Sequence, residues 1–338
     1  MEKSDTFNIQ PYRRAIQIGF AGVCVLIGIQ FNVFVRHLEQ GVIPAVSRPP
    51  GVEAFLPISA LISLKYWLLT GVFNKVHPSG LVLLLIIITT GLFLKRGFCS
   101  WVCPVGLLSE YLAKVHGLVF RKPLSLPRWL DYSLRGVKYF ILLFFLWSIM
   151  VQMNVGYLER FIYGAYNKVA DIKMLKFFTQ ISATAVLVIA GLAILSVLMR
   201  SFWCRYLCPY GALLGALSWL SPLKIRRNKD TCIDCRKCTG VCPAQVQVHK
   251  ETAVLSDECN ACLQCVNACP VKDTLHLSGG RNRKALSGPA YAAVIVLLFL
   301  AGTTLARLAG VWQNNISVDE YRELVQDAAK TGHPYYVE

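Results

Sequence analysis

The apolar positions of the chain gather into long runs that polar and basic segments separate. Five of these runs contain no charged residue and approach the roughly 20 residues that a helix needs to cross a bilayer. They are Ala15–Val35, Pro78–Leu94, Tyr139–Leu158, Phe177–Met199 and Ala285–Ala306. The pattern therefore predicts a mostly α fold, a polytopic bundle of about five transmembrane helices.

A sixth apolar stretch, "EAFLPISALISLKYWLLTGVF", runs from Glu53 to Phe73 and is interrupted by Pro57 and Lys65. Proline breaks a helix interior, and a lysine at the centre of a bilayer is costly. We therefore expect a re-entrant or interfacial helix here.

Composition supports a membrane protein. Of the 338 residues, 55% are hydrophobic and only 16% are charged, which lies outside the usual range of soluble domains. The net charge of +16 does not indicate a nucleic-acid partner, because Lys and Arg are spread between the apolar runs and no basic–aromatic binding motif is present.

The basic residues also predict an orientation. With five spans and the N-terminus inside, one side holds 23 Lys and Arg residues and the other holds ten. A crossing at the sixth stretch would send the basic loop around Lys95 and Arg121 outside, against the positive-inside tendency. We expect a bacterial-type inner-membrane protein in which the segment from Arg200 to Lys284 is cytoplasmic and the tail after Arg307 is periplasmic.

The cytoplasmic segment carries two cysteine runs, "CIDCRKCTGVCP" and "CNACLQCVNACP". Each has the C-x2-C-x2-C-x3-C-P spacing of bacterial two-cluster ferredoxins, in which the fourth cysteine of a run ligates the other cluster. One predicted [4Fe-4S] site therefore comprises Cys232, Cys235, Cys238 and Cys269, and the other comprises Cys259, Cys262, Cys265 and Cys242. Zinc needs only four ligands, usually in separated pairs, so eight thiols in this spacing favour an electron relay.

Two apolar runs end in a Cys-x-x-x-Cys-Pro motif, "GFCSWVCPVGLLS" and "FWCRYLCPYGALL". The repeat contains Cys99 and Cys103 in one copy and Cys204 and Cys208 in the other, and each proline suits the first turn of a following helix. A helix N-terminus makes a thiol more acidic, which favours metal binding. We expect the four cysteines to form a third redox centre, either iron–sulfur or copper; redox-active dithiols and simple packing of buried cysteines are the alternatives.

Spans that end in Cys-x-x-x-Cys-Pro, together with two tetracysteine runs, resemble the NapH-type membrane ferredoxins, the quinol dehydrogenase components of periplasmic nitrate reduction. The same core occurs in NosR-type regulators, and a related arrangement in a cytochrome-oxidase assembly protein implicated in copper reduction. The resemblance extends from about Arg48, in "RPPGVEAF", to about His276. The fifth span and the tail after Arg307 depart from the four-span NapH pattern.

These observations predict four parts of the chain. Residues 1–222 form a membrane domain with four spans and both Cys-x-x-x-Cys-Pro motifs, 223–284 an inserted α+β two-cluster ferredoxin domain, 285–310 the fifth transmembrane helix and 311–338 an extracytoplasmic tail. In that tail, "SVDEYRELVQDAA" is typical of a short amphipathic helix with Ser317 as its cap.

The expected function is electron relay between the quinone pool or a cytoplasmic donor and a partner redox enzyme, as a subunit of an oxidoreductase complex rather than a stand-alone enzyme. The alternative is a maturation factor that reduces a metal or a thiol during assembly of another enzyme. Redox partner proteins, periplasmic ones included, and quinol are the expected partners. His37 and His77, near outer helix ends, are candidates for hydrogen bonds to a quinone.

Overall fold

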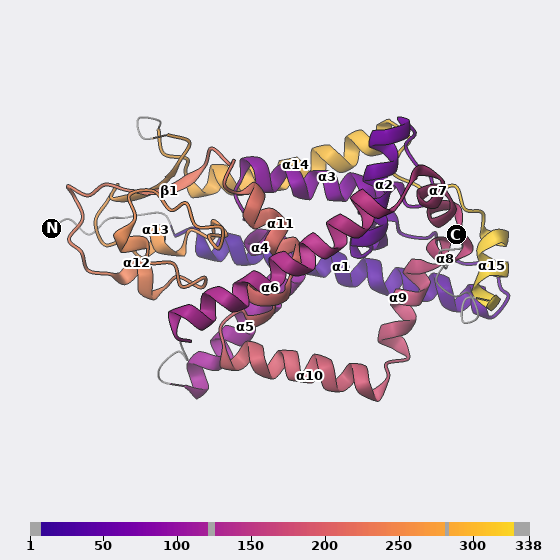
Figure 1. Cartoon of the computed structure of the whole chain (residues 1–338), viewed down its shortest axis with the longest axis horizontal. Coiled ribbons are helices and arrows are strands. Elements are labelled where there is room, and N and C mark those ends of the chain that lie inside the picture. The colour runs from indigo at the N-terminus through magenta and orange to yellow at the C-terminus, as the bar shows by residue number, and fades with distance from the viewer. Residues whose placement is uncertain (1–7, 121–125, 281–283, 328–338) are drawn as a thin grey trace. The chain divides into compact units, whose positions relative to one another are not determined.

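The structure is a computed structural model that describes residues 8–120, 126–280 and 284–327. Helices dominate the structure, as Figure 1 shows. The described residues contain one two-stranded sheet. The predicted mostly helical fold is therefore confirmed.

The chain forms two compact units. The first takes the described residues of Met1–Ala21, Ile87–Leu142 and Ile189–Leu298, and the second those of Gly22–Ile86, Leu143–Val188 and Phe299–Glu338. All twelve cysteines of the predicted sites belong to the first unit, so it alone carries the candidate metal chemistry.

Three helices of the described residues are long and apolar enough to cross a membrane. They are α1 (Gln10–Glu39), the continuous stretch Trp129–Gln152, which contains most of α6 (Arg128–Trp147) and the turn that follows it, and α14 (Gly288–Leu308). A fourth candidate is the pair α9 (Ala170–Thr179) and α10 (Ala183–Leu198), while α3 (Pro78–Phe93) is apolar but has only 16 residues. The protein is thus a membrane protein, and a count of five spans stays a prediction.

The third span differs from its predicted limits of Tyr139–Leu158. Helix α6 (Arg128–Trp147) begins eleven residues earlier and continues as a π-turn, η2 (Ser148–Gln152). Asn154 then caps a separate helix, α7 (Val155–Tyr163), by accepting the N–H of Tyr157 at 3.0 Å. The first turns of α6 carry charged side chains, so a search for uncharged apolar runs leaves them out. In the structure, charged side chains of these turns form ion pairs.

The fourth predicted span, Phe177–Met199, is broken. Helices α9 and α10 meet at an angle of 80°. Ser182 starts α10 because its hydroxyl accepts the N–H of Ala185 at 3.2 Å, and serine is a strongly preferred cap. The polar residues Thr179, Gln180 and Ser182 within the apolar run were the available signal for this break.

The sixth stretch contains a 3-10 turn, η1 (Pro50–Phe55), and helix α2 (Pro57–Thr70). With 14 residues, α2 is too short to cross a bilayer. Lys65 has a local partner set: its Nζ donates to the carbonyls of Ile149 and Met150, each at 3.0 Å, and to that of Met153. The lysine therefore satisfies the carbonyls at the end of η2.

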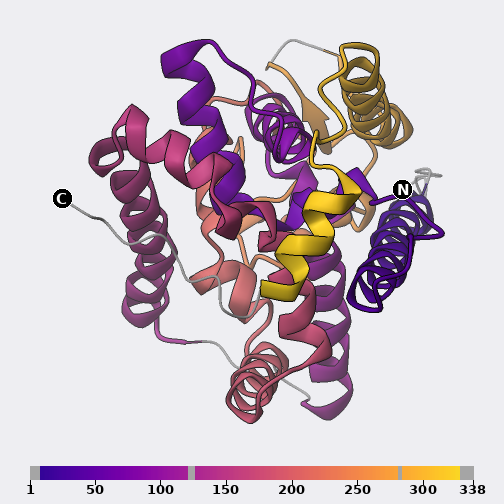
Figure 2. The same cartoon turned by 90° about the vertical axis from the view of Figure 1, so that its right-hand side faces the viewer.

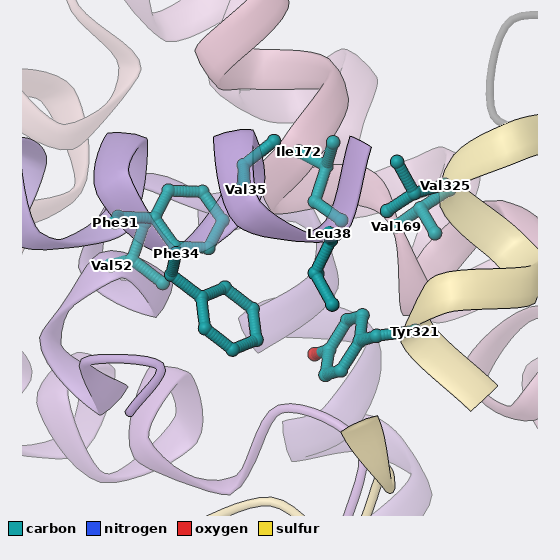
Figure 3. Packing of buried hydrophobic residues seen from close by; sticks show 9 residues of the cluster. All are labelled: Phe31, Phe34, Val35, Leu38, Val52, Val169, Ile172, Tyr321 and Val325. Carbon is teal, nitrogen blue, oxygen red and sulfur yellow. The ribbon is translucent and has the colours of Figure 1, made fainter. Parts of the chain in front are cut away.

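A hydrophobic cluster in the second unit holds the C-terminal helix, α15 (Val318–Asp327). Figure 3 shows Tyr321 and Val325 of α15 beside Leu38 and Val169. The hydroxyl of Ser317 accepts the N–H of Glu320 at 3.1 Å, so the predicted capped amphipathic helix is confirmed. Figure 2 shows this helix in yellow.

The shorter elements frame the candidate sites. The first unit contains α4 (Gly97–Trp101), α5 (Pro104–Val119), η3 (Trp203–Leu207), α11 (Pro209–Leu217), β1 (Lys224–Arg227), α12 (Lys237–Gly240), η4 (Val248–Lys250), α13 (Gln264–Asn267) and β2 (Leu275–Ser278). The second unit also contains α8 (Ala165–Lys168). Strands β1 and β2 are antiparallel, with Ile225 opposite Leu277, and they bracket both tetracysteine runs.

Candidate metal centres

Two cavities in the first unit each gather four cysteines. Cavity A is lined by three cysteines of the first run and the last of the second, namely Cys232, Cys235, Cys238 and Cys269. Cavity B is lined by the complementary set, Cys259, Cys262, Cys265 and Cys242. The fold thus brings together the two crossed sets of thiols that the spacing predicts.

Left-handed backbone turns wrap each run around its cavity. Asp234 and Arg236 have φ values of 51° and 58°, and Ala261 and Leu263, at the equivalent positions of the second run, have 49° and 58°. Non-glycine residues rarely adopt this conformation. The repeated strain curls the x2 segments so that three cysteines of one run line the same cavity.

The two cavities differ in polarity. Cavity A includes Arg227, Arg236 and His249 in its lining, and Arg227 Nη1 donates to Cys232 Sγ at 3.3 Å. Cavity B is lined, apart from its cysteines and Asn260, by apolar residues such as Val246 and Val254. Hydrogen bonds to sulfur, charge and exposure set cluster potentials, so these surroundings would give the two sites different potentials.

The two Cys-x-x-x-Cys-Pro motifs have the same local geometry. The first cysteine of each lies in a short helical segment, α4 or η3, and the second caps the next helix, α5 or α11, with proline at the first position. Cys208 Sγ accepts the N–H of Gly211 at 3.3 Å. The predicted role of the prolines is therefore confirmed.

Sequence reasoning missed one glycine in each motif. A Cβ on Gly106 would lie 2.0 Å from the carbonyl oxygen of Cys99, and one on Gly211 would lie 3.1 Å from that of Cys204. Both glycines let the new helix approach the preceding turn. The repeated Cys-Pro-x-Gly pattern was the signal that could have identified them.

The four cysteines of the motifs lie close enough to interact electrostatically. The Cys204 thiol interacts electrostatically with the thiols of Cys208, Cys103 and Cys99. Burial raises the pKa of Cys103 to about 12, and Cys99 adds to this effect, although two backbone N–H groups at the start of α5 oppose it. The N–H groups at the helix N-terminus thus lower the pKa of Cys103, as expected, but burial outweighs them.

A third cavity, cavity C, adjoins these motifs. Its lining includes one cysteine of each motif, Cys99 and Cys204, together with Arg96 and Glu258. The buried guanidinium of Arg96 interacts electrostatically with the Cys99 sulfur and donates to the carbonyl of Asp257 at 2.8 Å. A fixed positive charge of this kind stabilises an anionic centre.

The two histidines considered for a quinone have other partners in the second unit. His37 Nδ1 contacts the carbonyl of Val33 at 2.7 Å, four residues earlier in α1. His77 is fully buried, with Nε2 at 2.6 Å from the carbonyl of Asn167 and Nδ1 at 3.4 Å from Glu53 Oε1. Both ring nitrogens of His77 are therefore engaged within the protein.

Two family models match the chain. One, described as a 4Fe-4S binding domain, matches residues 76–127 and 182–228, which contain both Cys-x-x-x-Cys-Pro motifs. The other, described as a 4Fe-4S dicluster domain, matches residues 224–270, which contain both tetracysteine runs. The chain therefore carries iron–sulfur binding domains.

Similar proteins are named for electron transfer. The chain is 41% identical over 336 residues to YccM, a candidate electron transport protein of Escherichia coli (strain K12), and the match covers 98% of this chain and 94% of YccM. It is 28% identical over 154 residues to the ferredoxin-type protein NapH of Haemophilus influenzae. That match covers 45% of this chain and 49% of NapH.

The regulatory protein NosR of Stutzerimonas stutzeri is 28% identical over 171 residues, which cover 48% of this chain and 21% of NosR. No solved structure matches the chain. The match to YccM over nearly both full lengths, the iron–sulfur domains and the apolar helices establish an electron-transfer protein of the membrane. The chain belongs to the NapH/NosR-type family of polytopic membrane 4Fe-4S ferredoxins.

Proposed function

We propose that the chain relays electrons between the quinone pool or a cytoplasmic donor and a partner redox enzyme, through two [4Fe-4S] clusters and a third iron–sulfur centre. Cavities A and B hold the two clusters with the crossed ligand sets. The observation that carries the proposal is that each cavity collects three cysteines of one run and the fourth of the other.

The residues fit a cubane cluster. Such a cluster needs one thiolate at each of four iron corners and changes its charge by one electron without making or breaking a bond to substrate. Burial raises the pKa of Cys262 to about 12, with the Arg13 charge opposing the shift. Metal binding releases thiol protons, so the cluster supplies the positive charge that stabilises these buried thiolates.

The third centre is held by Cys99, Cys103, Cys204 and Cys208. The electrostatic interactions among their thiols support a shared site. The 4Fe-4S binding domain matches two segments of the chain that contain these motifs, which supports iron–sulfur over copper. This centre would link a donor or acceptor in the membrane, quinol being the candidate, to the ferredoxin clusters.

The alternative function, a maturation factor that reduces a metal or thiol, needs a reactive thiolate or a site for one metal ion. Burial raises the pKa of Cys204 and of Cys208, which makes them poor nucleophiles at neutral pH. This observation favours the relay.

Metal analysis of the purified protein tests the proposal. We expect about twelve iron and twelve sulfide per chain, four of each per cluster, and EPR signals from both ferredoxin clusters after reduction. About four iron per chain would refute the two-cluster assignment. Replacement of Cys99, Cys103, Cys204 or Cys208 by Ala should lower iron to about eight and stop electron transfer from quinol while both ferredoxin signals remain.

Cys24→Ala is the matched control, because Cys24 lies in α1 outside every motif. It should retain the full iron content and the wild-type transfer rate. If the four motif variants behave like this control, the third centre is wrong. If they transfer electrons normally but lose thiol-dependent reduction of copper, the maturation function is the better account.

A further inference from the structure

The second tetracysteine run is hydrogen-bonded to residues that precede the ferredoxin domain. Side chains of residues 10–101 donate to backbone carbonyls of the loop 256–262, which carries Cys259 and Cys262. The donors are Lys95 to Ser256 at 3.0 Å, Arg96 to Asp257 at 2.8 Å, Ser100 to Asn260 at 2.6 Å, Trp101 to Ala261 at 3.1 Å and Gln10 to Cys262 at 3.0 Å. Four donors between Lys95 and Trp101 and one at the start of α1 hold this loop against α1 and α4.

Charged side chains strengthen the same attachment. Asp257 and Glu258, directly before Cys259, pair with α6: the Tyr139 hydroxyl donates to Asp257 at 2.5 Å and Lys138 bonds Glu258. Lys138 and Glu258 are both buried, so neither charge is left unpaired away from water. The run that supplies most of cavity B is thus tied to three helices.

The segment after Cys242, the fourth cysteine of cavity B, is also held by a hydrogen bond. Arg205, between Cys204 and Cys208, donates to the carbonyl of Ala244, two residues after Cys242, at 2.7 Å. Its other guanidinium nitrogens pair with Asp131 at 2.9 Å each. A single side chain therefore connects the second Cys-x-x-x-Cys-Pro motif with the wall of cavity B.

Cavities B and C share their wall. Pro243, Ala244 and Asn260 line both. Cavity A is lined by residues of the ferredoxin segment between Arg227 and Leu275, and none of its lining residues also lines cavity C. Cavity B therefore shares a wall with the cavity at the Cys-x-x-x-Cys-Pro motifs, whereas cavity A does not.

The run around cavity A faces water instead. Cys235 is exposed, whereas its counterpart in the second run, Cys262, is 7% exposed. Cys238 and Cys265, the third cysteines of the two runs, are both 8% exposed. Ile233 is 52% exposed, and the charged residues Asp234, Arg236 and Lys237 around it are exposed too. An apolar side chain within a mixed-charge rim over a redox site is typical of a small transient interface.

We propose that the ferredoxin domain exchanges electrons with the membrane side at the cavity B cysteines. At the cavity A cysteines it exchanges electrons with a soluble one-electron redox protein. This assignment rests on the proposed function. With clusters bound by the cavity A cysteines (site A) and the cavity B cysteines (site B), single electrons would pass between the Cys-x-x-x-Cys-Pro motifs and the soluble partner by way of site B and site A, in either direction. Such transfer would make or break no bond and move no proton.

Relaxation enhancement by a soluble paramagnet tests the order. The full chain in lipid nanodiscs is partly reduced, so that few molecules contain two reduced clusters and magnetic coupling between clusters is small. EPR power saturation is then measured with and without chelated dysprosium. We expect the half-saturation power of the site A signal to rise severalfold and that of the site B signal to stay nearly unchanged. Equal enhancement of both signals, or a larger effect at site B, would overturn the assignment.

Two kinds of variant assign the signals. Cys232→Ala should remove the dysprosium-sensitive signal and Cys259→Ala the insensitive one. Because loss of a ligand can unfold the domain, Arg227→Gln provides a variant with all ligands retained, and it should shift only the sensitive signal. A shift of the insensitive signal would overturn the order, whereas iron and sulfide for fewer than two clusters would refute the proposed function itself.

Discussion

Arg227 is the residue that places a positive charge against one candidate ligand. Its Nη1 donates to Cys232 Sγ at 3.3 Å, and reduction of a cluster adds a negative charge that this guanidinium stabilises. Arg227→Gln should therefore lower the reduction potential of the site A cluster by about 60 mV, the equivalent of a tenfold change for one electron. An EPR-monitored redox titration measures the shift.

Arg226→Gln is the control for this prediction. Arg226 precedes Arg227 in β1, so its side chain points to the other face of the strand, and it does not line cavity A. The potential should stay at the wild-type value. Equal shifts in both variants would mean that general charge, rather than the contact to sulfur, sets the potential.

Glu53 is a second residue whose charge has a measurable role, in the second unit. Arg48 pairs with Glu53 at 2.8 Å and with Asp171 at 2.6 Å, all three buried, and Ser79 donates to Glu53 at 2.5 Å. Removing one partner of a buried pair costs about 3–5 kcal/mol. Glu53→Gln should lower the thermal unfolding midpoint markedly, while Asp319→Asn should leave it unchanged, because the Asp319 side chain is 88% exposed in its pair with Arg322.

The Glu53 carboxyl also predicts a pH dependence. Burial opposes its ionisation, but Arg48 and His77 outweigh burial and lower the pKa of Glu53 from 4.5 to about 2. A lowered pKa contributes stability that is present above pH 4.5 and is lost as the pH falls toward about 2. The difference in unfolding midpoint between wild type and Glu53→Gln should therefore shrink over this window; a constant difference would contradict it.

At the scale of elements, the close approach of α5 to α4 depends on Gly106. A Cβ there would lie 2.0 Å from a backbone oxygen of Cys99, which cannot move aside as a flexible side chain would. Gly106→Ala should destabilise the protein by at least about 1–3 kcal/mol, the usual cost of overpacking, and reduce the iron bound by the motif cysteines. Thermal unfolding and iron content of the purified variant measure both effects.

Gly117→Ala, in the same helix, is the matched control. Nothing lies within 4 Å of a Cβ at Gly117, and alanine is favoured over glycine in a helix by about 1 kcal/mol. This variant should keep its iron and be as stable as wild type or more so. Loss of iron in both variants would show that α5 itself, not its approach to Cys99, is the sensitive feature.

Helix α6 shows how elements differ from their sequence pattern. Asp131, Arg135 and Lys138 made its first turns look like a loop. In the fold, Asp131 accepts two bonds from Arg205 and Lys138 pairs with Glu258. Charges that are paired in this way can lie in the first turns of an apolar helix, so the hydropathy of a segment alone underestimates its length.

At the scale of the whole molecule, the distribution of basic residues predicts the orientation. A reporter fused after Lys284 should behave as cytoplasmic and one fused after Gln326 as periplasmic, because the basic side of a membrane protein stays inside. Alkaline phosphatase and a fluorescent protein fused at each position distinguish the two sides. Reporters on the same side would remove α14 as a crossing.

Much of the chemistry was predictable because it depends on short spacings. The C-x2-C-x2-C-x3-C-P runs, the proline after Cys103 and Cys208, and the Ser317 cap act within a few residues, so the sequence shows them directly. The break before α10 and the role of Gly106 are local too and were missed, because polar residues within an apolar run and a glycine after Cys-Pro are weak signals by themselves.

By itself, the sequence determined that the protein lies in a membrane, that it has two repeated Cys-x-x-x-Cys-Pro motifs and that its ferredoxin cysteines occur in two equivalent runs. Only the tertiary structure decided which run is attached to α1, α4 and α6 and which faces water. The reason is the separation of the partners: Lys138 and Glu258 are 120 residues apart, and Gln10 and Cys262 are 252 apart. No local spacing encodes such pairs, since they form only when packing brings the helices and the loop together.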